Sequence, residues 1–292
     1  LNTHLDTTIA LARYSQVCKE PSYRTLVESA RKATNAIMAL DSANWLYKLL
    51  FRAINLTLLP SAQARRLPLY KRAIKRLAWK YHTPNFYRIK AIFPRLVMPG
   101  GYIDRNLALG SFAFHYLPIN LMDLARHRRH FQDTGMDAPI ARLARFIQES
   151  GVRGRWRELA YERYALGFWA EALWQLCQIY DDWCYRAWLA EAVLDLEDEA
   201  MGIPPSLLGG NREALAWPRA CPPPPEPGVR VLSIPREREW EVLWVNTLAR
   251  VATVPAWQAT QWLDTSGQSI PPPAQLPARQ FVVARGALGS EN

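Results

Sequence analysis

The sequence predicts a mainly α-helical fold: a multi-helix domain of packed helical hairpins, followed by a proline-rich, extended C-terminal region. Through most of residues 1–202, apolar residues recur with the period of about 3.6 that is typical of amphipathic helices. Fourteen of the 22 prolines lie after residue 203, and proline is disfavoured in helix interiors and central strands. We therefore expect a helical domain at 1–202 and a separate C-terminal region at 203–292.

The N-terminal part reads as a series of helices. Residues 1–60 predict two or three helices, among them 25–40 and 45–59. The first of these two has the periodic apolar residues Leu26, Ala30, Ala33, Ile37 and Leu40. A turn at 97–103 separates this part from a helix at 105–131 that Pro118 is expected to interrupt. Helix then follows helix over 121–202, and we expect these to pack as hairpins.

The C-terminal region predicts extended chain, one helix and two short strands. The stretch "WPRACPPPPEPG" at 217–228 is expected to form an extended linker or a strap on a surface. Residues 229–234 and 280–284 read as the two strands. Residues 236–252 are predicted to be the helix, with apolar residues on one side: Trp240, Leu243, Trp244, Thr247, Leu248 and Val251.

Composition limits the class of protein. With 292 residues, 49 % of them hydrophobic, the chain can bury a substantial core. It has no uninterrupted apolar run of about 18 residues and no basic-then-apolar leader, so we expect neither a transmembrane segment nor a secretory signal. None of the four cysteines belongs to a CxxC pair, which favours reduced thiols in an intracellular, cytoplasm-like compartment.

Positive charge is concentrated in one segment. Residues 42–103 contain twelve Lys and Arg and no Asp or Glu. The rest of the chain has 24 basic and 26 acidic residues, so the whole excess of the +10 net charge belongs to this basic segment. Such asymmetry is typical of a protein with a polyanionic partner.

Within the basic segment, residues 70–81 predict an amphipathic helix. Its apolar residues form one face: Tyr70, Ala73, Ile74, Leu77, Ala78 and Tyr81. The opposite face has five cations: Lys71, Arg72, Lys75, Arg76 and Lys80. Like charges four residues apart weaken an isolated helix by a few tenths of a kcal/mol per pair. Because the cations of this face repel one another, the face indicates a negatively charged partner.

Aromatic and basic residues alternate after this helix, which Pro84 is expected to end. Phe86 and Tyr87 are followed by Arg88, Lys90 and Arg95. Rings on which bases stack, set among cations that bind phosphates, are typical of a groove for single-stranded nucleic acid. The alternative is that these aromatic side chains belong to the core.

Three weaker groups of residues were weighed as sites of chemistry. Asp123, His127, His130 and Asp133 have a helical spacing suited to a metal, but Arg126, Arg128 and Arg129 surround them. Asp181 and Asp182 resemble part of the aspartate-rich helix of all-α isoprenoid enzymes, but the third Asp of that pattern is absent, and a helix N-cap is the simpler explanation of the pair. The acidic run 195–199 ends a helix and suits a cationic partner or solvent.

We therefore expect a protein that binds the phosphate backbone of RNA or DNA as a subunit of a larger nucleoprotein assembly. We expect it to be non-enzymatic, with no cofactor, no metal and no catalytic residues. Other subunits or copies of itself would be its protein partners. One alternative is a helical scaffold that docks an acidic protein or an anionic surface, and another is a magnesium-dependent all-α enzyme. The residues expected to contact nucleic acid are Arg65, Arg66, Lys71, Arg72, Lys75, Arg76, Trp79, Lys80, Phe86, Tyr87, Arg88, Lys90, Arg95, Arg128 and Arg129.

Overall fold

A computed structural model of the chain describes residues 1–39, 56, 61–82, 114–208, 224–236, 239–254, 257 and 259–287. The backbone divides into two compact units, Leu1–Ala165 and Leu166–Asn292. Most of the described chain is helical and strands occur in its C-terminal part, so the mainly α-helical class is confirmed. The domain boundary at residue 202 and the packing of helices as repeated hairpins stay predictions.

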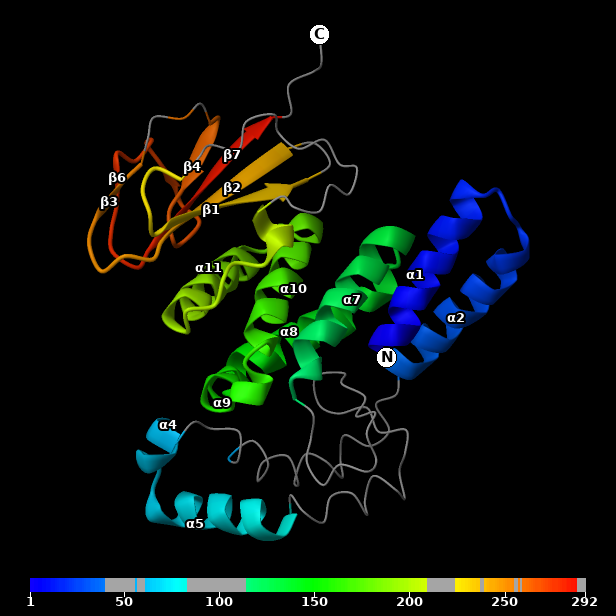
Figure 1. Cartoon of the computed structure of the whole chain (residues 1–292), viewed down its shortest axis with the longest axis horizontal. Coiled ribbons are helices and arrows are strands. Elements are labelled where there is room, and N and C mark those ends of the chain that lie inside the picture. The colour runs from blue at the N-terminus through cyan, green and yellow to red at the C-terminus, as the bar shows by residue number, and fades with distance from the viewer. Residues whose placement is uncertain are drawn as a thin grey trace. The chain divides into compact units, whose positions relative to one another are not determined.

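The first unit is built from helices (Figure 1). Its described α-helices are α1 (Asn2–Val17), α2 (Ser22–Met38), α4 (Ser61–Arg65), α5 (Leu69–Leu77), α7 (Tyr116–Phe131), α8 (Asp137–Glu149) and α9 (Val152–Glu158). Shorter turns follow α5, α7 and α9, namely the π-helical η1 (Ala78–His82) and the 3-10 turns η2 (Thr134–Met136) and η3 (Ala160–Glu162). Apart from Leu56, the predicted helix 45–59 lies outside the described residues, as does the predicted turn 97–103.

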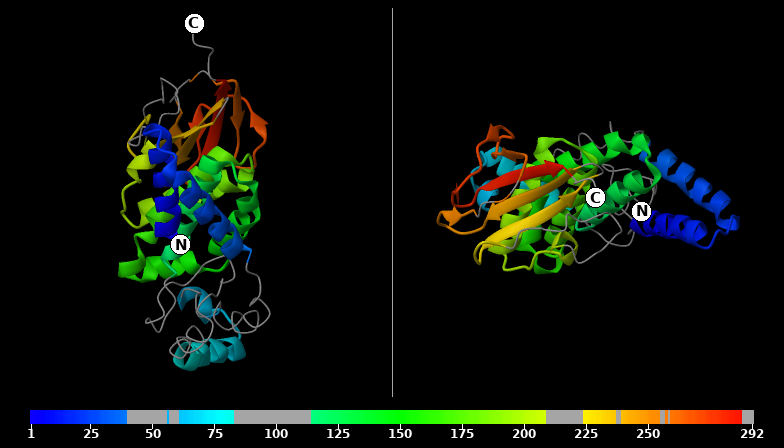
Figure 2. Two further views of the ribbon diagram at one scale, coloured as in Figure 1. Left: turned by 90° about the vertical axis from the view of Figure 1, so that its right-hand side faces the viewer. Right: turned by 90° about the horizontal axis from the view of Figure 1, so that it is seen from above.

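Helices α1 and α2 lie side by side, as two views of the ribbon agree (Figures 1 and 2). The buried residues of α2 are Val27, Thr34 and Met38, whereas Leu26 of the predicted stripe is exposed. A polar contact explains this shift, because the His4 ring lies 3.1 Å from both the Thr34 hydroxyl and the Ala30 carbonyl oxygen. The helix predicted for 25–40 is therefore confirmed, but its buried face is rotated.

The interruption predicted near Pro118 stays a prediction, because part of the predicted helix 105–131 lies outside the described residues. Helix α7 begins at Tyr116, so Pro118 lies in its first turn. Backbone N–H groups of the first turn have no acceptor within the helix, and a residue without an N–H is tolerated there. Residues 105–113 lie outside the described residues.

The second unit combines two helices with two sheets. Its described elements are α10 (Ala165–Ile179), α11 (Trp183–Asp198), the 3-10 turn η4 (Pro205–Leu208), β1 (Val229–Pro235), β2 (Glu239–Asn246), β3 (Ala252–Thr253), β4 (Gln261–Leu263), β5 (Ser269–Ile270), β6 (Gln275–Leu276) and β7 (Phe281–Ala287). The larger sheet has the order β1-β2-β7-β4-β5 with antiparallel pairing, and β3 pairs with β6 in the smaller one. The two predicted strands are confirmed as β1 and β7, although β2 lies between them.

The helix predicted at 236–252 is wrong. Residues 239–246 form strand β2 in the centre of the sheet. Trp240, Val242 and Trp244 point to one face, and Leu243 and Val245 point to the other. Because both faces of β2 are covered, residues 242–245 are a continuous apolar run, and such a run satisfies helical and strand periodicities equally. Pairing with β1 and β7 decides between them.

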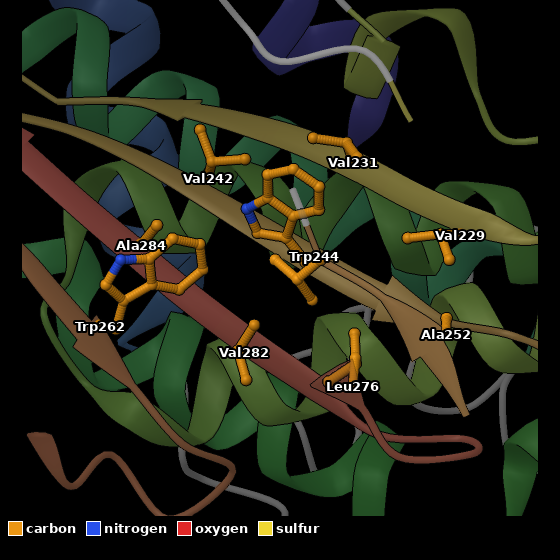
Figure 3. Close-up of a cluster of buried hydrophobic side chains, with 10 residues drawn as sticks. Val229, Val231, Val242, Trp244, Ala252, Trp262, Leu276, Val282 and Ala284 are labelled. Atoms are coloured by element: carbon orange, nitrogen blue, oxygen red, sulfur yellow. The ribbon is translucent and has the colours of Figure 1, made fainter. Parts of the chain in front are cut away.

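A tryptophan-rich core covers one face of the larger sheet (Figure 3). Val231, Trp244 and Val282 form a row across β1, β2 and β7. Val242, Ala284 and Trp262 form the neighbouring row. Most of these side chains are fully or nearly fully buried, so this face of the sheet is a packed core.

Helix α11 covers the opposite face of the sheet. The Trp183 ring stacks on Phe281 at 6.0 Å between ring centroids, and its indole N–H donates to the Thr265 carbonyl at 2.9 Å. Gly267 has a positive φ of 82° in the same loop, and a Cβ there would lie 2.9 Å from the Trp183 ring. The β4–β5 turn is thus fitted closely around the start of α11.

Most of the predicted proline-rich strap, residues 217–228, lies outside the described residues. Among the helices that the structure describes, none is long and apolar enough to cross a lipid bilayer.

Candidate nucleic-acid interface

The basic segment contributes one continuous helical stretch to the described structure, residues 69–82, formed by α5 and the π-turn η1 (Figure 1). Pro68 precedes it as N-cap, and its carbonyl accepts from the Arg72 N–H at 3.1 Å. This proline is compatible with helix initiation because its fixed φ suits the start of a helix. The predicted helix 70–81 is therefore confirmed, with a change to π geometry over its last five residues.

Two arginines and a tryptophan mark the basic face of this stretch. Arg72, Arg76 and Trp79 are separated by four and three residues, the spacing of side chains on one helix face. All three are exposed, Trp79 to 54 %. Lys71, Lys75 and Lys80 flank them, and Arg65 and Arg66 are exposed at the end of α4. The structure therefore brings the predicted cations of 65–80 together on one short segment.

The charge of Glu158, at the end of α9, acts on Lys75 of this face. Burial lowers the pKa of Lys75, and the Glu158 charge opposes this shift only in part. Lys71/Lys75, Arg72/Arg76 and Arg76/Lys80 remain like-charge pairs four residues apart, which weaken the helix by a few tenths of a kcal/mol each.

The apolar face of α5 is exposed as well. Ile74 and Leu77 are exposed to 41 % and 56 % of their surface, and α5 itself buries no residue. In η1, by contrast, Ala78 is only 2 % exposed. The described part of the segment thus presents two chemically different surfaces, one basic and one apolar.

The remaining predicted contacts have different positions. Phe86, Tyr87, Arg88, Lys90 and Arg95 lie outside the described residues. Arg128 and Arg129 are half-buried on α7, and the Arg128 Nε donates to the Asp137 carboxylate at 2.7 Å. Arg128 therefore already has an anionic partner within its own unit.

The group of Asp123, His127, His130 and Asp133 does not form a metal site in the described structure. Asp133 instead caps η2, accepting from the Gly135 N–H at 3.1 Å, and also accepts from Asn35 at 3.2 Å. Asp123 and His127 are buried on α7. Burial, reinforced by the Asp6 charge, raises the pKa of Asp123 to about 7, and burial lowers the pKa of His127 to about 4.

Asp181 is surrounded by three guanidinium groups. Its Oδ1 accepts from Arg236 and Arg285 at 2.8 Å each, and from Arg186 at 3.3 Å. Burial would raise the pKa of Asp181, but these three charges outweigh burial and lower it. The neighbouring Asp182 is the N-cap of α11 and accepts from the Cys184 N–H at 3.0 Å. Three adjacent cations oppose binding of Mg²⁺, so these contacts do not support the magnesium alternative.

The acidic end of α11 has its cationic partners within its own unit. Glu197 accepts two-pronged hydrogen bonds from Arg230 on β1 at 2.9–3.1 Å. Asp198 pairs with Arg279 at 2.7 Å. Carboxylates at a helix C-terminus are unfavourable with the helix dipole, and these arginines offset that effect.

One buried ion pair was missed by sequence reasoning. Arg186 of α11 and Glu241 of β2 have no exposed side-chain surface and are joined by two hydrogen bonds of 2.8 Å. A signal was present, since Arg186 is the one charge in the largely apolar stretch "WCYRAWLA" (183–190) and Glu241 is the one charge in "WEVLWV" (240–245). Charged residues are rarely buried unless they are paired, so two such interruptions indicate partners.

Comparison of the chain with protein families, with curated proteins and with solved structures finds no match.

Proposed function

We propose that this protein binds nucleic acid through the phosphate backbone, without catalysing a reaction, as a subunit of a larger nucleoprotein assembly. The observation that carries the proposal is the basic face of α5 and η1, where exposed cations lie on a helix within a 62-residue segment that contains no acidic residue. Lys and Arg contacts of this kind position a nucleic acid and do not read its sequence.

The size of the surface sets the expected strength of binding. Residues 71–80 span about 14 Å of helix, and about four or five cations can reach phosphates there. The slope of log affinity against log salt concentration is then roughly −3 for a single strand and −4 for a duplex. Non-specific dissociation constants of about 10⁻⁴ to 10⁻⁶ M at physiological salt are expected.

The exposed apolar side of α5 supports a place in a larger assembly. A phosphate backbone cannot cover Ile74 and Leu77, whereas a neighbouring protein subunit can. Exposed apolar patches of this kind commonly mark interaction sites.

The same observation favours a second candidate function, binding to an anionic lipid surface. A helix with a cationic face and an exposed apolar face can lie in a membrane interface, with its apolar side chains among the acyl chains. The two candidates differ in the face that they use, because nucleic acid needs the cations alone and lipid also needs the apolar side chains.

Fluorescence anisotropy of labelled oligonucleotides at several salt concentrations tests the proposal. The informative variant is Arg72→Glu/Arg76→Glu, and the matched control is Arg24→Glu/Lys32→Glu, which makes the same charge change at exposed positions of α2. At about 0.1 M salt each lost phosphate contact reduces affinity by roughly 5-fold on a single strand. We expect a loss of about 25-fold or more in the α5 variant and a much smaller loss in the control.

Two results would contradict the proposal. One is equal weakening in the two variants, which would mean that net charge and not α5 determines binding. The other is an absence of salt-dependent binding to any oligonucleotide by the unmodified protein. Binding to vesicles of anionic lipid that is lost in Ile74→Ser/Leu77→Ser would then favour the second candidate.

A further inference from the structure

We propose that Trp79 is a stacking platform for an unpaired base, so that the basic face of α5 and η1 binds single-stranded nucleic acid in preference to duplex. This inference rests on the proposed function and specifies its ligand. The observation behind it is the position of one exposed indole among the cations. An interface that contacts only the phosphate backbone of a nucleic acid does not require an indole there.

Trp79 is placed where a strand held by the neighbouring cations would present a base. It is on the same helix face as Arg72 and Arg76, one turn beyond Arg76. Its side chain is 54 % exposed although tryptophan is a residue that usually buries most of its surface. A cation and an adjacent ring are the two elements by which proteins bind single strands without sequence preference.

The other exposed aromatic side chains of the segment are less suited to this role. Tyr70 and Tyr81 belong to the apolar face, which lacks cations to hold phosphates. The Lys80 ammonium already lies 5.1 Å from the centroid of the Tyr81 ring, so a cation occupies one face of that ring. Among the described aromatics of this stretch, Trp79 is the one on the basic face.

The π-helical turn supports a functional position for Trp79. Single π-helical turns are rare and frequently occur at functional sites. Ala78 directly before Trp79 is buried, which anchors the backbone at the point where the indole leaves it. An anchored ring loses little conformational freedom when a base stacks on it.

A single strand fits this arrangement better than a duplex does. Bases of a duplex are stacked on each other and present only their edges, so a ring on the protein surface cannot stack on them without unpairing. An unpaired strand can place a phosphate at Arg76 and the adjoining base on Trp79. The phosphates contribute affinity for both forms, and the indole contributes only to the single strand.

The test compares three labelled ligands of equal length in the same anisotropy assay: a single-stranded oligothymidine, the same backbone with abasic residues, and a duplex. The abasic strand keeps the phosphates and removes the bases. We expect the unmodified protein to bind oligothymidine about 5- to 150-fold more tightly than the abasic strand, the effect of one stacked base.

Variants at position 79 separate stacking from charge. Trp79→Ala is expected to abolish the preference for oligothymidine while leaving abasic binding and the salt slope unchanged, and Trp79→Phe is expected to retain most of it. Tyr161→Ala is the matched control, since Tyr161 is exposed to 64 % in the same unit but lies on η3. This control should behave as the unmodified protein does.

Each of the other possible results contradicts one part of the proposal. Equal affinity of the unmodified protein for oligothymidine and the abasic strand, with strong salt dependence, would overturn stacking and leave the proposed function intact. Equal weakening of both strands by Trp79→Ala would show that the indole does not act through bases. Tighter binding to duplex than to the single strand would overturn the preference. Failure of all three ligands to bind would overturn the proposed function itself.

Discussion

Removing Glu241 is expected to destabilise the second unit strongly. Each of the five N–H groups of Arg186 has an acceptor: two on Glu241 at 2.8 Å, the carbonyls of Tyr180 and Asp182 at 3.2 and 3.1 Å, and Asp181 at 3.3 Å. In Glu241→Leu the fully buried guanidinium loses its buried carboxylate and keeps only the exposed Asp181 carboxylate at 3.3 Å. Breaking a buried pair by removing one partner costs about 3–5 kcal/mol, and we expect that loss in the free energy of unfolding.

Removing Arg186 in place of Glu241 is expected to lower the free energy of unfolding by less. In Arg186→Met, Glu241 keeps Arg285 at 3.0 Å and Arg236 at 3.2 Å, so its charge stays compensated. Two backbone carbonyls lose their donor, and we expect a loss of about 2–3 kcal/mol. The double variant leaves neither charge buried alone, and apolar replacement of a whole buried pair is often nearly neutral. Because the two backbone carbonyls still lack a donor, we expect its loss to be close to that of Arg186→Met alone, about 2–3 kcal/mol, and well below the sum of the single losses.

Urea unfolding followed by far-UV circular dichroism measures these differences. The matched control is Glu197→Gln, which breaks a pair of the same two-pronged geometry whose side chains are 31 % and 37 % exposed. Exposed pairs contribute less than about 1 kcal/mol. If Glu241→Leu costs no more than this control, or if the single losses add without coupling, the reasoning is refuted.

Further predictions concern the sheet and the buried polar groups. In Gly286→Ala the new Cβ would overlap the Trp240 ring on the paired strand, and we expect a loss of about 1–3 kcal/mol by urea unfolding; an unchanged midpoint would contradict this close approach. The Asn246 amide nitrogen lies 2.8–3.0 Å from three carbonyl oxygens, so Asn246→Ala is expected to cost about 2–3 kcal/mol, and a loss below 1 kcal/mol would contradict it. Asp123 and His127 have pKa values of about 7 and about 4. Raising the pH from about 4 to about 7 therefore lowers stability through Asp123, and raising it from about 4 to about 6.5 increases stability through His127. These two pH dependences offset each other. In Asp123→Asn only the His127 contribution remains, so we expect the free energy of unfolding to rise between about pH 4 and about pH 6.5 by up to about 1.4 kcal/mol per pH unit. A pH profile parallel to that of the unmodified protein would contradict this.

Elements stabilised by local periodicity were predictable from the sequence. Helix α2 and the stretch 69–82 follow from apolar spacing because a helix is formed by contacts between residues three and four apart. The concentration of positive charge in the basic segment is also a property of the sequence alone, as is the proximity of Arg72, Arg76 and Trp79 on one helix. The proposed interface therefore depends on short-range information.

Tertiary structure decided the features that depend on distant partners. An apolar run that is buried on both faces has no period that distinguishes helix from strand, so β2 was defined only by its pairing with β1 and β7. The buried stripe of α2 was likewise set by the His4 contact to Thr34.

The roles of the charged residues in the second unit were decided in the same way. Asp181 was weighed as a metal ligand because it and Asp182 resemble part of an aspartate-rich helix. Arg236 and Arg285 are 55 and 104 residues away in the chain and meet it only in the folded unit. The sequence by itself determined which residues carry charge and that the strongly periodic stretches α2 and 69–82 are helical. Folding determined which charges neutralise each other, because Coulomb interactions depend on distance in space and not on separation along the chain.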